Sequence, residues 1–103
     1  MVFIESSSFT LNVRELLSDE SYAALQQHLI VYPEAGAVIQ DTGGLRKIRW
    51  SARCRGKRGG TRVIYFHLAH RHQIRLLLIY RKGIKDDLSP GERKILRALN
   101  DSW

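Results

Sequence analysis

Two neighbouring segments rich in β-branched and aromatic residues constrain the fold of this 103-residue chain most strongly. Residues 62–68 read RVIYFHL, residues 73–82 read QIRLLLIYRK, and only residues 69–72 separate them. Two strand-like segments joined by so short a connection predict a β-hairpin. Leu77, Leu78 and Ile79 show no polar alternation, which predicts that the second strand is central and covered on both faces.

The remaining segments supply partners for this hairpin. Residues 45–50 alternate with period two, which predicts a strand with Lys47 and Arg49 on one side and Ile48 and Trp50 on the other. Residues 2–4 predict a short edge strand before a serine-rich turn. Apolar spacing of three and four predicts one helix over 9–17 and a second from a Ser18 cap to the region of Pro33.

A C-terminal helix is predicted from residue 89 onward. Ser89 stands where an N-cap is needed, Pro90 is suited to the first helical position, and Glu92 completes a capping box. The predicted order is β-αα-βββ-α over a single domain, residues 1–103. This is an α+β fold with a mainly antiparallel four-stranded sheet, two N-terminal helices and one C-terminal helix.

Charge is distributed very unevenly along the chain. Residues 1–41 have a net charge of −5, residues 42–85 contain thirteen basic and no acidic residues, and residues 86–103 have a net charge of −1. Ordinary protein surfaces mix both signs, because opposite charges then pair. A segment of this length without one carboxylate predicts a surface that binds a polyanion.

Several classes of protein are not expected. The longest apolar run, Leu76 to Tyr80, is far shorter than the roughly 18 residues of a membrane span. The N-terminal residues lack the basic and apolar regions of a signal peptide, so a cytoplasmic protein without a membrane partner is predicted. A single cysteine, Cys54, agrees with a reducing compartment and excludes an internal disulfide. We predict neither a cofactor nor a bound metal.

Basic residues of the predicted strands form the most informative cluster. Lys47 and Arg49 share a face, Arg62 begins the adjacent strand, and Tyr80 and Lys82 end the last strand. Cations without a metal can cleave RNA if they hold the phosphate and stabilise the negative charge of the transition state. Arginine cannot act as the base, whereas a lysine crowded by other cations loses its proton more readily. Binding of phosphate without cleavage is the alternative that the spacing leaves open.

Several blocks of the sequence resemble a known protein family. The blocks are TGGLRKIRW at 42–50, GKRGG at 56–60, RVIY at 62–65, LLIYRK at 77–82 and DLS at 87–89. Together they are similar to the RelE/HigB group of bacterial toxins from type II toxin-antitoxin systems, and the first two are typical of its HigB-like branch. The resemblance covers nearly the whole chain.

This resemblance implies a ribosome-dependent endoribonuclease that cleaves mRNA in the ribosomal A site by attack of the 2′-hydroxyl. By position, Lys47 and Arg49 match the family's basic pair on the second strand, Arg62 matches the arginine opening the third, and Lys82 ends the fourth. Lys47 and Lys82 are then candidates for proton transfer. Arg49 and Arg62 are candidates for stabilising the negative charge of the transition state. Where well-studied members carry tyrosine or histidine, this chain has residues 86–88, reading DDL, and Tyr80 is the nearby aromatic.

The resemblance also implies partners. These are the ribosome with its RNA, the mRNA, and a cognate HigA-like antitoxin. A helix-turn-helix part of the antitoxin binds operator DNA for the complex. Alternatives are a non-enzymatic toxin of the same fold that poisons gyrase, a plain RNA- or DNA-binding module, and an inactive toxin that only binds its antitoxin. Contacts with RNA or the ribosome are predicted for Arg46, Arg53, Arg55, Lys57, Arg58 and Arg81.

Overall fold

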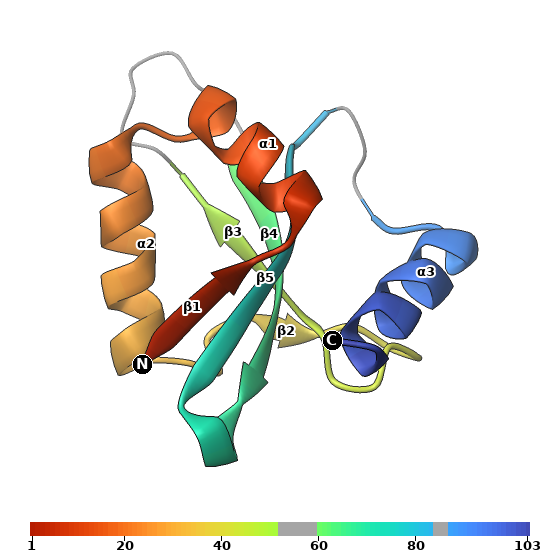
Figure 1. The fold of residues 1–103 in the computed structure, drawn as a ribbon. Helices are drawn as coiled ribbons and strands as arrows, with labels where there is room; N and C mark the ends of the chain where they lie inside the picture. The colour runs from red at the N-terminus through yellow and green to blue at the C-terminus, as the bar shows by residue number, and fades with distance from the viewer. Residues whose placement is uncertain (52–59, 84–86) are drawn as a thin grey trace.

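A computed structural model describes residues 1–51, 60–83 and 87–103 of the chain. Within these residues, five strands form one sheet in the order β1-β5-β4-β3-β2 (Figure 1). The strands are β1 (Val2–Glu5), β2 (Ala37–Val38), β3 (Arg46–Trp50), β4 (Thr61–Leu68) and β5 (Gln73–Arg81). The helices are α1 (Ser7–Leu16), α2 (Asp19–Val31) and α3 (Pro90–Asp101).

The predicted hairpin is confirmed as β4 and β5, which pair antiparallel. A short 3-10 turn, Ala69–Arg71, joins the two strands, and His72 closes the turn with a left-handed φ of 49°. Strand β5 lies inside the sheet, and it contributes Leu76 and Ile79 to one apolar core and Leu77 and Tyr80 to the other. The predicted covering of this strand on both faces is therefore confirmed.

The predicted sheet was wrong in two details. The sheet has a fifth strand, the two-residue β2, which pairs antiparallel with β3. In addition, β1 runs parallel to β5, with Val2 opposite Gln73 and Glu5 opposite Leu76. Two residues are too few to show a periodicity, and no short turn connects β1 to its partner, so neither feature has a local signal.

Each helix begins after a serine that accepts a hydrogen bond from the first turn. Ser6 Oγ accepts from the Phe9 N–H, and Ser18 Oγ accepts from the Ser21 N–H, each over 3.0 Å. The predicted capping box at α3 is confirmed, because Ser89 Oγ accepts from the Glu92 N–H while Glu92 Oε1 accepts from the Ser89 N–H. None of the helices in the described residues is long and apolar enough to cross a membrane.

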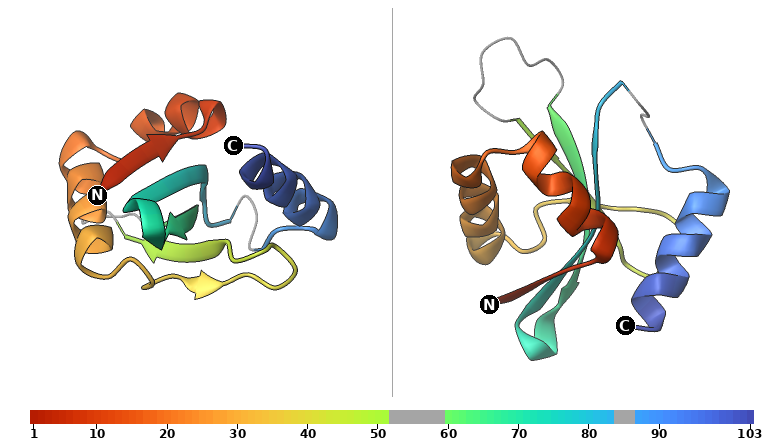
Figure 2. Two further views of the ribbon diagram at one scale, coloured as in Figure 1. Left: turned by 60° about the horizontal axis from the view of Figure 1, so that its bottom comes forward. Right: turned by 45° about the horizontal axis from the view of Figure 1, so that its top comes forward.

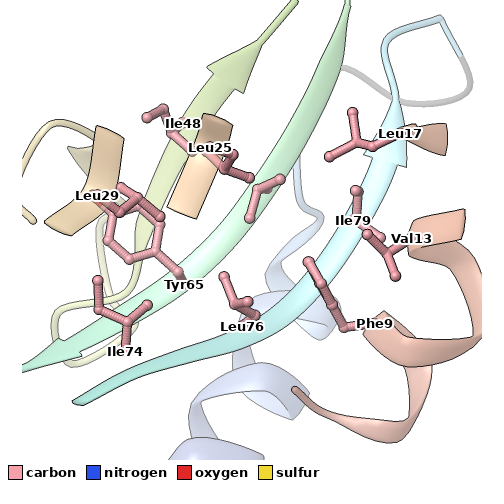
Figure 3. Close-up of a cluster of buried hydrophobic side chains, with 11 residues drawn as sticks. Phe9, Val13, Leu17, Leu25, Leu29, Ile48, Tyr65, Ile74, Leu76 and Ile79 are labelled. Atoms are coloured by element: carbon pink, nitrogen blue, oxygen red, sulfur yellow. The ribbon is translucent and has the colours of Figure 1, made fainter. Parts of the chain in front are cut away.

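Two apolar cores lie on opposite faces of the twisted sheet. Helices α1 and α2 cover one core, in which Phe9, Leu25 and Leu29 pack around Tyr65 and neighbouring strand residues (Figure 3). Helix α3 covers the other, smaller core through Leu96. Figure 2 shows α3 set apart from α1 and α2, against a different part of the sheet. The two faces therefore offer different surfaces to a ligand.

Candidate nucleic-acid interface

Four of the predicted site residues lie together on the sheet face that α3 partly covers. Arg49 on β3 stands directly opposite Arg62 on β4, and Arg62 stands directly opposite Tyr80 on β5. Lys47 lies two residues from Arg49 and therefore projects from the same face of β3. Directly opposed residues have Cβ atoms about 5 Å apart. We call Lys47, Arg49, Arg62 and Tyr80 the basic row.

Exposure increases along the basic row from the centre of the sheet towards β3. Arg62 is only 5% exposed and Tyr80 6%, and both residues interact with other parts of the chain. Arg49 is exposed, and Lys47 is partly covered. Like charges opposite each other destabilise a sheet, so the pairing of Arg49 with Arg62 favours an anion between or above them.

A carboxylate of the chain itself contacts the basic row. Lys47 Nζ donates a hydrogen bond of 2.7 Å to Asp87 Oδ1, and the two groups form an ion pair. This hydrogen bond and the charge of Lys47 lower the pKa of the Asp87 carboxyl, and the charges of Arg93 and Arg49 act in the same direction. The geometry makes Lys47 a hydrogen-bond donor to an anion.

Sequence reasoning did not assign a role to Asp87 or Arg93. Both lie in the C-terminal segment of mixed charge, where neither a charge run nor a strand pattern draws attention to them. Only the packing of α3 against the sheet brings this segment to β3. The one available signal was the position of Asp87. It lies in the segment where members of the RelE/HigB group, which the sequence resembles, carry a tyrosine or histidine.

Arg46 and Arg81 lie apart from the basic row. Side chains alternate along a strand, so Arg46 faces away from Lys47, and Arg81 faces away from Tyr80. Arg46 Nη1 donates to the backbone oxygens of Glu34 and Gly36 over 3.2 and 2.8 Å, which ties β3 to the preceding loop. Arg81 is exposed at the end of β5.

The last predicted residues lie at the end of the sheet or outside the described residues. Lys82 is exposed just beyond β5, and its backbone N–H donates to the Gly60 oxygen over 3.3 Å. Lys82 is therefore at the β5 end of the row, one position past the pair formed by Thr61 and Arg81. The predicted RNA-binding residues Arg53, Arg55, Lys57 and Arg58 lie outside the described residues.

No family model matches this sequence. Among solved structures, the chain is similar to a mutant of the Escherichia coli toxin RelE in the free state, with a TM-score of 0.58 and 12% sequence identity. The match covers 96% of this chain and 95% of that chain, so it includes the sheet and all three helices. At this identity the similarity concerns the fold alone, and the chain has a RelE-like fold.

Proposed function

We propose that this protein is the toxin of a bacterial type II toxin-antitoxin system, of the HigB-like branch, and that it is a ribosome-dependent endoribonuclease. The observation that carries the proposal is the basic row, in which two arginines and a tyrosine stand in register across three strands with a lysine beside them. The RelE-like fold and the sequence blocks at 42–50 and 56–60 support it.

In the proposed reaction, the 2′-hydroxyl of an mRNA nucleotide in the ribosomal A site attacks the adjacent phosphorus. The bond to the 5′-oxygen of the next nucleotide breaks, which leaves a 2′,3′-cyclic phosphate and a free 5′-hydroxyl. The pentacoordinate transition state carries additional negative charge on its non-bridging oxygens. Arg62 and Arg49 stabilise this charge, and the low exposure of Arg62 strengthens its contribution.

Proton transfer requires residues of the site other than Arg49 and Arg62. Arginine holds its proton too firmly to act as a base. Lys47 donates to a carboxylate oxygen in this structure, so its amine is suited to binding a phosphate oxygen. Lys82, exposed beside the β5 end of the row, is therefore our candidate for taking the proton from the 2′-hydroxyl. The hydroxyl of Tyr80 is buried, so RNA binding must expose it before it can supply a proton to the leaving oxygen.

The surrounding basic residues serve binding to the ribosome in this proposal. Arg81 and the four basic residues of segment 53–58 contact ribosomal RNA, whereas Arg46 contributes mainly through the Glu34–Gly36 loop that it holds. The partner that inhibits the toxin is a HigA-like antitoxin. Its helix-turn-helix part connects the complex to operator DNA, and an acidic segment of it neutralises the basic face.

A purified translation system tests the proposal. Ribosome-bound mRNA is mapped by primer extension after addition of wild-type protein, Arg49→Ala, Arg62→Ala or Arg71→Ala. Arg71 lies in the hairpin turn, far along β4 from the basic row, and is the matched control for loss of one charge. Loss of a transition-state cation is expected to slow cleavage by about 10²-fold. Arg71→Ala should retain most activity.

The outcome separates the proposal from its alternatives. Equal losses for all three variants would indicate diffuse electrostatic attraction without a catalytic row. Because Arg62 is buried, a folding defect in Arg62→Ala is controlled by its circular dichroism, and exposed Arg49 remains as an independent probe. If the wild-type protein leaves mRNA intact, the endonuclease proposal fails. DNA breaks in cells would then indicate gyrase poisoning, and absence of growth arrest would indicate an inactive toxin.

A further inference from the structure

The two residues that follow Asp87 are anchored to the fold. Leu88, the next residue, is buried in the core beneath α3, and Ser89 caps that helix in a complete capping box. Asp87 thus immediately precedes two anchored residues. Its carboxylate contacts Lys47 on β3, which lies forty positions earlier in the chain. The side chain of Asp87 is itself 82% exposed, so water reaches the carboxylate freely.

Positive charges from two separate elements act on this carboxylate, and Lys47 contacts it directly. Lys47 and Arg49 come from the same face of β3, and Arg93 comes from the first turn of α3, where its backbone N–H donates to the Ser89 oxygen. All three charges lower the pKa of Asp87, which is therefore an anion at neutral pH. A carboxylate and a phosphodiester both present two oxygens that share one negative charge, so cations arranged for one also suit the other.

We propose that the carboxylate of Asp87 occupies an anion site formed by Lys47, Arg49 and Arg93, and that an RNA phosphate displaces it when RNA binds. This inference rests on the proposed function for the identity of the ligand. It predicts that the charge of Arg93 also attracts the bound phosphate. It also gives Asp87 the role of a tethered competitor, which lowers the affinity of the free protein for isolated phosphates.

The exchange is physically easy. An exposed carboxylate regains full hydration when it leaves Lys47, and exposed ion pairs contribute little net free energy. Removing the competitor is therefore expected to tighten RNA binding by no more than about fivefold, which corresponds to one exposed ion pair. Removing Arg93 is expected to weaken binding and to reduce the salt dependence by about one phosphate contact.

Binding of a fluorescein-labelled oligoribonucleotide tests the inference. The probe carries 2′-O-methyl groups, so it cannot be cleaved, and anisotropy is measured with the full chain at several salt concentrations. Asp87→Asn should tighten binding by about two- to fivefold. Asp101→Asn is the matched control, since it makes the same charge change on α3, where Asp101 Oδ2 lies 3.9 Å from Arg97 Nε. Its effect should be less than about 1.5-fold, because salt screens distant surface charges.

Four results would overturn the inference. Unchanged binding by Asp87→Asn would show that its carboxylate does not compete with RNA. Equal tightening by Asp87→Asn and Asp101→Asn would show an effect of net charge alone. Weaker binding by Asp87→Asn would show that Asp87 positions Lys47 for RNA. In a Lys47→Met background, Asp87→Asn should lose most of its effect, so a full effect there would show that the two residues act independently. Thermal melting of each variant confirms that it is folded.

The binding assay needs neither ribosomes nor cleavage, so its failure is distinct from failure of the proposed function. Tightening by Asp87→Asn together with intact mRNA in the translation system would retain the anion site and reject the endonuclease. Normal cleavage by the wild-type protein together with unchanged binding by Asp87→Asn would retain the endonuclease and reject the anion site.

Discussion

Replacing Tyr65 by phenylalanine is expected to destabilise the protein by removing one oxygen atom that joins β4 to the loop between α2 and β2. Tyr65 on β4 is completely buried, and its ring packs between α2 and the sheet (Figure 3). Its hydroxyl donates to the Pro33 oxygen and accepts from the Gly36 N–H, each over 2.9 Å. Burial raises the pKa of this hydroxyl, which therefore stays protonated and remains a donor throughout the physiological range.

The size of the effect follows from what the hydroxyl leaves behind. The phenylalanine ring keeps the apolar packing, so the loss comes from the two hydrogen bonds. A hydrogen bond contributes about 1 kcal/mol net, and a buried backbone group left without a partner costs about 1–3 kcal/mol. The Gly36 N–H is buried, whereas the Pro33 oxygen is partly accessible to water. We therefore expect a decrease of about 2–3 kcal/mol in the free energy of unfolding.

Equilibrium unfolding in urea measures this decrease. With a denaturant slope of about 1.5 kcal/mol per molar, the midpoint should fall by about 1.3–2 M. Tyr32→Phe is the control, because Tyr32 is 59% exposed and a change there should cost less than about 0.5 kcal/mol. Amide exchange should also accelerate at Ala37 and Val38, since the loop before β2 loses its anchor. A midpoint for Tyr65→Phe equal to that of Tyr32→Phe would refute this reasoning.

Three further predictions concern the same architecture. Gly36→Ala should destabilise the fold by about 1–3 kcal/mol, because its Cβ would lie 2.8 Å from Tyr65 Cε1 and 2.9 Å from the Lys47 oxygen. Urea titration measures this loss, and an unchanged midpoint would contradict this packing. Ser89→Ala should cost about 1 kcal/mol through loss of the N-cap of α3, and a thermal melt like the wild type would count against the capping box. Because the pKa of Asp87 is lowered, its ion pair with Lys47 stabilises the fold fully at a pH above the ordinary carboxyl pKa of about 3.9. This stabilisation is lost as the pH falls through the lowered pKa. Carboxyl NMR titration should show the pKa of Asp87 rising in Lys47→Met, and an unmoved midpoint would exclude Lys47 as the cause.

The basic row shows how far sequence reasoning extends into the candidate site. Period-two alternation correctly placed Lys47 and Arg49 on one face of β3, and the hairpin correctly placed Arg62 near Tyr80. The same alternation places Arg46 on the opposite face, where it holds a loop. Charge alone did not separate these roles, because a basic residue that binds backbone oxygens and one that binds phosphate are identical in sequence.

Local interactions determined the elements of this protein, and the sequence alone showed them. Helix starts depend on interactions within a few residues, as at Ser18 and Ser89, and these leave capping patterns in the sequence. The hairpin and the strand at 46–50 leave patterns of periodic apolar residues. The tertiary structure decided the parallel pairing of β1 with β5, the addition of β2, and the approach of Asp87 to Lys47. These features join residues far apart in the chain, and the burial of two apolar cores selects them, so no local pattern records them.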